Sequence, residues 1–120
     1  MKRTKVLIVD DSDAVRDGLR SILSAHTNIE IVGEAVNGLD AIARTSHLHP
    51  DIILMDDQMP GMNGVEAAFH IKGRFPGIKV LLLTVHKNCI EEALAAGVDG
   101  YLMKDCHREE LLQMVRALSE

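Results

Sequence analysis

The chain has 120 residues, a net charge of −5, and 13 lysines and arginines that are dispersed along it. This length fits one domain with an ordinary hydrophobic core. The dispersed basic residues and the few aromatic rings, one Tyr and two Phe, exclude a nucleic-acid-binding surface of the basic or base-stacking kind.

The cysteines and the N-terminus indicate the compartment. Cys89 and Cys106 show neither a disulfide framework nor zinc-ligand spacing, so we expect reduced thiols. The N-terminal apolar run, residues 6–9, is too short for a signal peptide, and no later stretch is long enough to span a membrane. We therefore expect a cytoplasmic protein that does not enter a membrane.

Apolar runs of strand length recur along the chain. They are VLIV at 6–9, IILM at 52–55, VLLL at 80–83 and YLM at 101–103. Continuous rather than alternating apolar residues indicate strands that are buried on both faces, as in a parallel sheet. The segment 29–36 differs because Glu30 and Glu34 interrupt it, which favours an edge strand.

Segments with helical spacing separate these strands. Their expected apolar faces are Val15, Leu19, Ile22 and Leu23; Leu39, Ile42 and Ala43 within 39–47; Val65, Ala68 and Phe69 with the stem of Lys72; Ile90, Ala93 and Leu94 within 88–96; and Leu111, Val115 and Leu118. Asn63 and Glu66 have capping-box spacing, and Gly97 is placed to end a helix. The alternation predicts an α/β fold, a doubly wound parallel sheet with helices on both faces, in one domain over residues 1–120.

Polar residues follow four of the five expected strands. Asp10 and Asp11 follow the first strand, Asp56 the third, Thr84 the fourth and Lys104 the fifth. Ligands bind outside the carboxyl ends of strands in sheets of this kind. Three carboxylates gathered there would repel one another strongly. We therefore expect a hard divalent cation, Mg²⁺, among them.

The same residue types suit phosphoryl transfer. A metal, an ammonium group and a hydroxyl are what the oxygens of a transferring phosphoryl group require. An aspartate carboxylate can attack phosphorus, and the one at the tip of the central strand is best placed to do so. Taken singly, each residue has an ordinary explanation such as helix capping, but the agreement of four strand ends indicates a site. The expected site comprises Asp56 as nucleophile; Asp10, Asp11 and the backbone carbonyl of Gln58 as metal ligands together with Asp56; Lys104 as cation; and Thr84 as hydroxyl donor.

These motifs have the order and spacing of a known family. VLIVDDS, DIILMDDQMPGMNG, LLLT and GYLMKD resemble the receiver domain of bacterial two-component response regulators over essentially the whole chain. IVGEAVNGLDAI and GYLMKD are most similar to the NarL/FixJ branch. The resemblance implies a flavodoxin-like five-stranded sheet of order 2-1-3-4-5 with five helices. It also implies that Asp56 is the phosphoacceptor, that Lys104 contacts the phosphoryl group, and that Thr84 and Tyr101 form the switch.

The resemblance further implies a signalling domain that assists only its own phosphorylation and dephosphorylation. A sensor histidine kinase would phosphorylate Asp56 with Mg²⁺ bound, Thr84 would move toward the phosphoryl group, and Tyr101 would follow. The face formed by the fourth helix, fifth strand and fifth helix would then change, and could form a homodimer. Leu112 and Met114 on the last helix could make a phosphorylation-dependent contact, or could serve packing within the domain alone. Relatives usually regulate transcription through a LuxR-type helix-turn-helix output domain. These residues contain no such domain, so contact with DNA would need a segment outside this chain.

Two residues depart from the family pattern. Asp57 stands where the family usually has an apolar residue, and strand alternation turns it away from Asp56, toward a helix-covered face. We expect the strand to end or twist there, so that Asp57 reaches solvent or a basic partner. Val85, after Thr84, stands where relatives often carry a small residue, and its methyl groups are expected to narrow access to the phosphoryl site. Neither departure lies at a proposed catalytic position.

Three other functions compete with this interpretation. DSDAV at 11–15 fits the nucleophile motif of haloacid-dehalogenase-like phosphatases, but only 16 residues follow Lys104, which leaves no room for that family's closing acidic motif. A flavodoxin-like flavin carrier would need a phosphate-binding loop where this chain has two aspartates. A receiver that serves only as a docking module is the third alternative, and Asp57 and Val85 motivate it.

Overall fold

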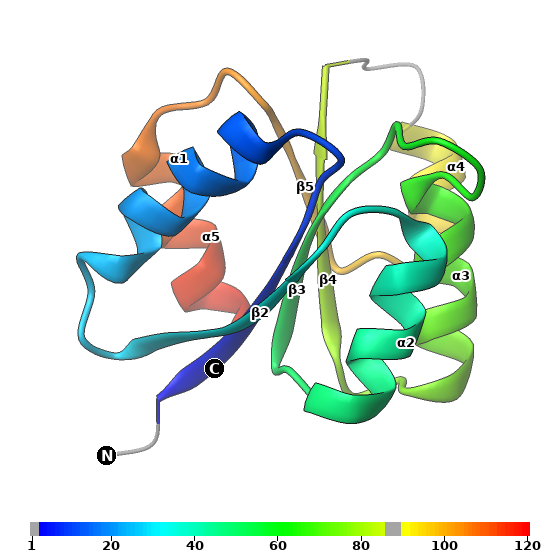
Figure 1. Cartoon of the computed structure of the whole chain (residues 1–120), viewed down its shortest axis with the longest axis horizontal. Helices are drawn as coiled ribbons and strands as arrows, with labels where there is room; N and C mark the ends of the chain where they lie inside the picture. Colours follow the sequence, from blue (N-terminus) through cyan, green and yellow to red (C-terminus); the bar gives the residue numbers. More distant parts are fainter. Residues whose placement is uncertain (1–2, 86–89) are drawn as a thin grey trace.

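The computed structural model describes residues 3–85 and 90–120. In these residues five strands alternate with five helices (Figure 1). The strands are β1 (Thr4–Val9), β2 (Ile29–Ala35), β3 (Ile52–Asp56), β4 (Lys79–Thr84) and β5 (Gly100–Met103). The helices are α1 (Asp13–Ser24), α2 (Gly38–Leu48), α3 (Gly64–Arg74), α4 (Ile90–Ala95) and α5 (Arg108–Leu118). Cys89 and the first two residues of the helix predicted over 88–96 lie outside the described residues.

The strands form one parallel sheet in the order β2-β1-β3-β4-β5. The predicted strand order is therefore confirmed, as is the position of β2 at an edge. The register pairs Val9 with Met55, Asp56 with Leu83, and Thr84 with Met103. Because the strands are parallel and end at similar levels, the residues that follow them emerge together at one edge of the sheet.

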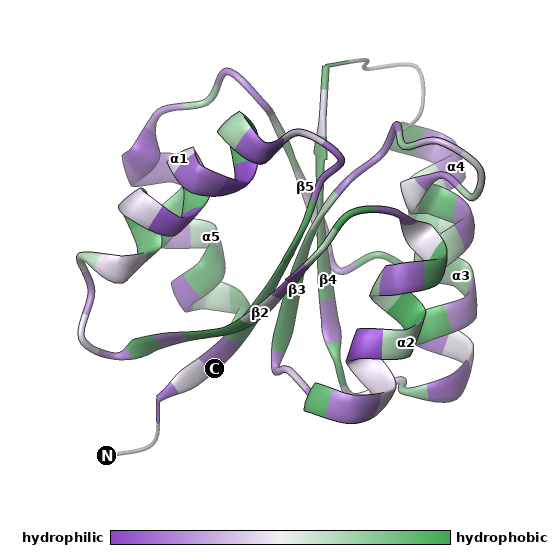
Figure 2. Cartoon of the chain, viewed as in Figure 1, coloured by the Kyte–Doolittle hydropathy of each residue, from purple (hydrophilic) through white to green (hydrophobic). Residues whose placement is uncertain are grey.

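Helices cover both faces of the sheet, as predicted. Figure 1 shows α1 and α5 on one face and α2, α3 and α4 on the other. Side chains alternate between the two faces along each strand: Val6, Ile8 and Leu54 pack under α1 and α5, whereas Leu7 and Ile53 pack under α2 and α3. The apolar strands and the polar outer sides of the helices are visible in Figure 2.

Several residues predicted to face the core are instead exposed. Leu39 is 66% exposed, Phe69 63% and Leu94 55%, so the predicted core faces of α2, α3 and α4 are partly wrong. The buried side chains of α2 and α3 are mostly small: Ala41 and Thr45 in α2, and Ala67, Ala68 and Ile71 in α3. Small side chains let a helix lie close to the sheet, and the buried face therefore follows that close approach rather than the largest apolar residues.

Two side chains of the last helix pack within the domain. Leu112 is only 7% exposed, and Met114 packs with the core between the sheet and helices α1 and α5. The structure thus shows the packing role for both side chains, and a dimer contact through them stays a prediction.

The predicted helix-end signals are confirmed. Asn63 accepts a hydrogen bond from the Glu66 backbone N–H at 2.9 Å, and the Glu66 carboxylate accepts one from the Asn63 backbone N–H at 3.4 Å, which forms a capping box. Gly97 follows α4 with a φ of +95°, a conformation that favours glycine.

A glycine at the start of α3, Gly64, lies against β3. A Cβ added to Gly64 would overlap the Asp56 backbone carbonyl oxygen. Gly64 also donates its backbone N–H to the Asp57 carbonyl at 3.0 Å. The absence of a side chain at position 64 therefore lets α3 begin directly beside the end of β3.

Gly64→Ala tests this close approach. We expect it to reduce the free energy of unfolding by about 1 to 3 kcal/mol, because the added methyl group overlaps backbone atoms. Gly73→Ala in the same helix is the control: its Cβ would meet no described atom within 4 Å, so the higher helix propensity of alanine should leave stability unchanged or slightly raised. Urea unfolding of both variants provides the measurement, and equal effects would contradict the prediction.

Candidate functional site

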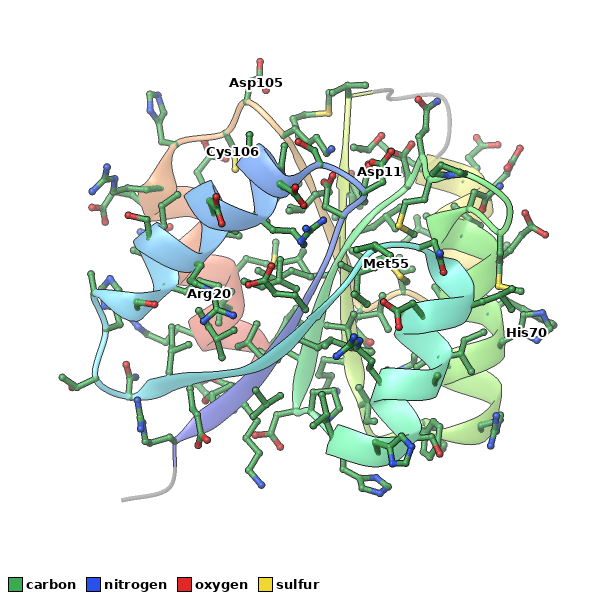
Figure 3. The ribbon with its side chains drawn as sticks, viewed as in Figure 1. Asp11, Arg20, Met55, His70, Asp105 and Cys106 are labelled. Carbon is green, nitrogen blue, oxygen red and sulfur yellow. The ribbon has the colours of Figure 1, made fainter. Side chains whose placement is uncertain are left out.

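Three carboxylates converge at the carboxyl ends of β1 and β3. Asp10, Asp11 and Asp56 each offer an oxygen, and these oxygens lie within 4.8 Å of one another. Asp10 is 1% exposed and Asp56 5%, whereas Asp11 is exposed. Figure 3 shows Asp11 on the loop that follows β1, at the edge of the sheet where the strands end. The sequence-based expectation that these residues meet is confirmed.

Backbone N–H groups orient the two buried carboxylates. Asp10 Oδ1 accepts a hydrogen bond from the Ser12 N–H at 2.9 Å, and Asp56 Oδ1 accepts one from the Gln58 N–H at 3.2 Å. In each case the donor lies two residues further along the chain, in the loop that leaves the strand. The turn after each strand therefore fixes one carboxylate oxygen and leaves the second directed toward the shared centre.

Lys104 bridges the two buried carboxylates. Its Nζ lies 2.9 Å from Asp10 Oδ2 and 3.2 Å from Asp56 Oδ2. Its backbone N–H donates to the Thr84 carbonyl at 2.8 Å, which anchors the lysine beside β4. Although burial alone would lower the pKa of Lys104, the hydrogen bond to Asp10 and the charge of Asp56 raise it above the usual value. The amine therefore stays protonated at neutral pH.

Asp56 is harder to ionise than an exposed aspartate. Burial and the charge of Asp10 raise the pKa of Asp56 to about 6, although the Gln58 N–H and Lys104 act in the opposite direction. Near neutral pH the carboxylate form still predominates. The group is thus a charged nucleophile held in an unfavourable environment, which any additional positive charge at the site would relieve.

The composition of the cluster fits a hard divalent cation. Three carboxylates and one lysine leave a net charge of −2, and carboxylate oxygens are ligands that Mg²⁺ prefers. Asp11, the most exposed member, leaves the cluster open to solvent. The site is therefore suited to bind Mg²⁺.

A buried arginine supports the site, and the sequence analysis missed it. Arg16 on α1 is 8% exposed and donates to the Asp10 backbone carbonyl at 2.6 Å, to Glu34 Oε1 at 2.9 Å and to the Asp13 carboxylate. Arg20 also pairs with Glu34, and its hydrogen bond, outweighing the effect of burial, lowers the pKa of Glu34. Glu34, which interrupts the apolar pattern of β2, could have indicated this contact in the sequence. A partly buried glutamate on an edge strand requires a cationic partner.

Thr84 and Asp57 contact each other at the ends of β4 and β3. The Thr84 side chain is fully buried, and its Oγ1 donates to Asp57 Oδ2 at 2.9 Å. Strand β3 ends at Asp56 as predicted, but Asp57 is only 5% exposed. The prediction that Asp57 reaches solvent is therefore wrong. Its backbone N–H still donates to the Leu83 carbonyl at 3.2 Å, which keeps residue 57 against β4.

The remaining predicted residues lie around this centre. Gln58 has an exposed side chain, and its backbone is held beside Asp56 by the hydrogen bond described above. Tyr101 is 38% exposed on β5, and Val85 is 57% exposed directly after β4. The structure therefore brings Asp10, Asp11, Asp56 and Lys104 into one cluster, and places Thr84 next to it.

Comparison with known proteins identifies the family. The chain matches the model of the response regulator receiver domain over residues 6–116. It belongs to this family. It is 46% identical over 117 residues to the response regulator protein VraR of Staphylococcus aureus, a match that covers 96% of this chain and 56% of VraR. This receiver domain thus spans little more than half the length of those relatives.

Solved structures agree with this assignment. The signal receiver domain of the response regulator NarL from Mycobacterium tuberculosis superimposes with a TM-score of 0.94 at 30% identity, covering 99% of this chain and 98% of that one. A LuxR-family two-component response regulator from Aurantimonas sp. gives a TM-score of 0.93 at 30% identity, covering 98% of this chain and 86% of that one. The predicted similarity to receivers of the NarL and LuxR type is confirmed, and the phosphatase and flavin-carrier alternatives are excluded. Among the described helices of this receiver domain, none has the length and apolar character needed to cross a membrane.

The raised pKa of Asp56 predicts how stability depends on pH. The folded-state pKa, about 6, lies above the usual value of 3.8, so the folded state binds the proton more tightly. The ionised carboxylate therefore destabilises the fold at neutral pH, and this penalty is relieved as the pH falls through 6 toward 4. Without divalent cations, Asp56→Asn should raise the free energy of unfolding by about 1 to 3 kcal/mol at pH 7.5. The gain should disappear near pH 4.

Urea unfolding in the presence of a chelator measures this difference across the pH range. Asp105→Asn provides the control, because Asp105 is exposed and points away from the molecule in Figure 3. A gain for Asp56→Asn that is the same at pH 7.5 and pH 4 would contradict the electrostatic explanation.

Proposed function

We propose that this receiver domain is a phosphorylation-dependent switch in which Asp56 accepts a phosphoryl group from a sensor histidine kinase. The observation that carries this proposal is the convergence of Lys104 on Asp10 and Asp56, with distances of 2.9 and 3.2 Å from its Nζ. A buried carboxylate that is surrounded by two further acids and one fixed ammonium group has the charge pattern that phosphoryl transfer requires.

Transfer of the phosphoryl group depends mainly on how the reacting groups are positioned. An Asp56 carboxylate oxygen forms the bond to phosphorus, and the bond from phosphorus to the histidine nitrogen of the kinase breaks, with the electron pair returning to the imidazole. Lys104 is protonated and stands where it can contact a phosphoryl oxygen. Mg²⁺, held by Asp10, Asp11, Asp56 and the Gln58 carbonyl, would supply positive charge against the developing charge on the phosphoryl oxygens. Water that reaches the open side of the site then hydrolyses the aspartyl phosphate and releases inorganic phosphate. The domain thus acts only on its own aspartate.

The switch would pass through β4 and β5. In the proposed active state the Thr84 hydroxyl donates to a phosphoryl oxygen, and Tyr101, on the neighbouring strand β5, moves into the space that Thr84 leaves. The phosphoryl group binds one arrangement of the α4, β5 and α5 face better than the other and so shifts the population between them. That face would form a homodimer or contact an output domain.

The partners follow from the relatives. VraR and the LuxR-family relatives are response regulators, and this chain covers only 56% of VraR. We infer that the domain regulates transcription through a LuxR-type helix-turn-helix output domain in the full-length protein, since the 13 lysines and arginines of this chain are dispersed along its sequence rather than clustered. Phosphorylation by a sensor histidine kinase would require the domain to lie in the cytoplasm.

Phosphorylation with acetyl phosphate and Mg²⁺ tests the central assignment. We expect one equivalent of phosphate on the wild-type domain and none on Asp56→Asn, which keeps the shape of the side chain but removes the attacking charge. Lys104→Ala should fold but accept phosphate at least about tenfold more slowly, because the ammonium group stabilises the transferring charge. Intact-mass measurement over time provides the readout.

Asp105→Asn again serves as the control and should be labelled like the wild type. Equal labelling of Asp56→Asn would show that another residue is the phosphoacceptor. If neither acetyl phosphate nor beryllofluoride changes the wild-type domain, the docking-module function is the correct one.

Mg²⁺ alone should stabilise the fold, because it binds the folded state and not the unfolded chain. At a concentration of 100 times its dissociation constant the expected gain is about 2.7 kcal/mol. Asp10→Asn and Asp11→Asn should each remove most of this gain, since each removes one ligand charge. Lys104→Ala should retain it, because the lysine repels the cation. Thermal unfolding with and without Mg²⁺ measures these effects, and an equal gain in Asp10→Asn would contradict the ligand assignment.

A further inference from the structure

The hydrogen bond between Thr84 and Asp57 has a consequence for the switch. Thr84 Oγ1 donates to Asp57 Oδ2 at 2.9 Å, and the two residues are 0% and 5% exposed. Asp57 directly follows Asp56, the proposed phosphoacceptor. The hydroxyl that the switch requires is therefore directed at the carboxylate next to the phosphorylation site.

A threonine hydroxyl has one proton to donate. A hydrogen bond from a hydroxyl to a carboxylate is charge-assisted and stronger than one between neutral groups. Burial removes the competition from water and strengthens it further. Thr84 cannot donate fully to Asp57 and to a phosphoryl oxygen on Asp56 at the same time, so the two acceptors compete for one proton.

The backbones around this pair are fixed. The Asp57 N–H donates to the Leu83 carbonyl at 3.2 Å, and the Asp57 carbonyl accepts from the Gly64 N–H at 3.0 Å. On the other side, the Thr84 carbonyl accepts from the Lys104 N–H at 2.8 Å. The carboxylate therefore stays beside β4, and rotation of the Thr84 side chain between its staggered positions is the simplest way to exchange one acceptor for the other.

We propose that Asp57 is a positioning residue that holds Thr84 in the inactive orientation and so raises the threshold for activation. This inference rests on the proposed function of Asp56 and Thr84. The phosphoryl group must attract the hydroxyl strongly enough to replace the Asp57 contact, and Asp57 then loses this donor while it remains buried. A ligand shifts such an equilibrium only by the difference in its affinity for the two states. The Asp57 carboxylate stabilises the inactive state and so reduces the net free energy with which the phosphoryl group favours the active one.

Replacement of Asp57 should therefore favour the active state. Asp57→Leu removes both charge and acceptor, and the affinity for beryllofluoride in the presence of Mg²⁺ should rise about tenfold, the effect of losing one charge-assisted hydrogen bond. Asp57→Asn has the same shape and keeps a neutral acceptor oxygen, so its gain should be smaller, about threefold. Asp57→Asn also covers the case in which the leucine variant fails to fold. Isothermal titration calorimetry provides the affinities.

A double-mutant cycle separates this mechanism from a general effect of charge. Removing any acid near an anion site favours anion binding, but an effect transmitted by the Thr84 hydroxyl requires that hydroxyl. In a Thr84→Val background, which keeps the side-chain shape, Asp57→Leu and Asp57→Asn should each change the affinity less than twofold. A gain in that background equal to the gain in the wild type would overturn the proposal.

NMR scalar couplings of Thr84 provide a readout that needs no phosphoryl mimic. They should report one side-chain rotamer in the ligand-free wild type and averaging between rotamers in Asp57→Leu. The same rotamer population in both proteins would overturn the proposal whatever the affinities. By contrast, failure of the wild type to bind beryllofluoride at all would refute the proposed function of Asp56, whereas normal binding with no effect of Asp57 would refute only this inference.

Discussion

The structure of this site depends on how three like charges share a small volume. The cluster gathers Asp10, Asp11 and Asp56 within 4.8 Å, and two of these acids are almost completely buried. Lys104 offsets part of the repulsion through contacts with Asp10 and Asp56, but two negative charges remain uncompensated by it. Burial, together with the charge of Asp10, raises the pKa of Asp56. A group that is costly to ionise, and that additional positive charge would relieve, is suited to the binding of Mg²⁺ and of a phosphoryl group.

The surrounding fold holds these charges in place. Parallel strands that end at one level bring the acids together, and the turns after β1 and β3 fix one oxygen of each buried carboxylate. Arg16 ties the backbone of Asp10 to the edge strand through Glu34, and Gly64 lets α3 begin against Asp56. These contacts place buried charged groups and a crowded backbone around the site, features that are common where function constrains the residues.

Much of the fold and of the site was predictable from sequence. The predictions that rest on local or periodic patterns were correct. They are the apolar strands, the edge strand at 29–36 that Glu30 and Glu34 interrupt, and the helix start at Asn63. Convergence of the acids with Lys104 was predictable because parallel strands must place their carboxyl ends at one edge. The buried faces of α2 and α3 were not predictable from sequence. The exposure of Leu39 and Phe69 depends on how closely each helix approaches the sheet.

The sequence by itself determined the class of fold, the family and the group of residues at the carboxyl edge of the sheet, because each follows from spacing along one chain. Only the tertiary structure decided how the side chains pair. Asp57 was expected to reach solvent or a basic partner, yet the packing of β3 against β4 buries it and makes it an acceptor for Thr84. Arg16 reaches Asp10 and Glu34 only because α1 lies across β1 and β2. Such pairings depend on the distances between segments far apart in sequence, which no local pattern specifies.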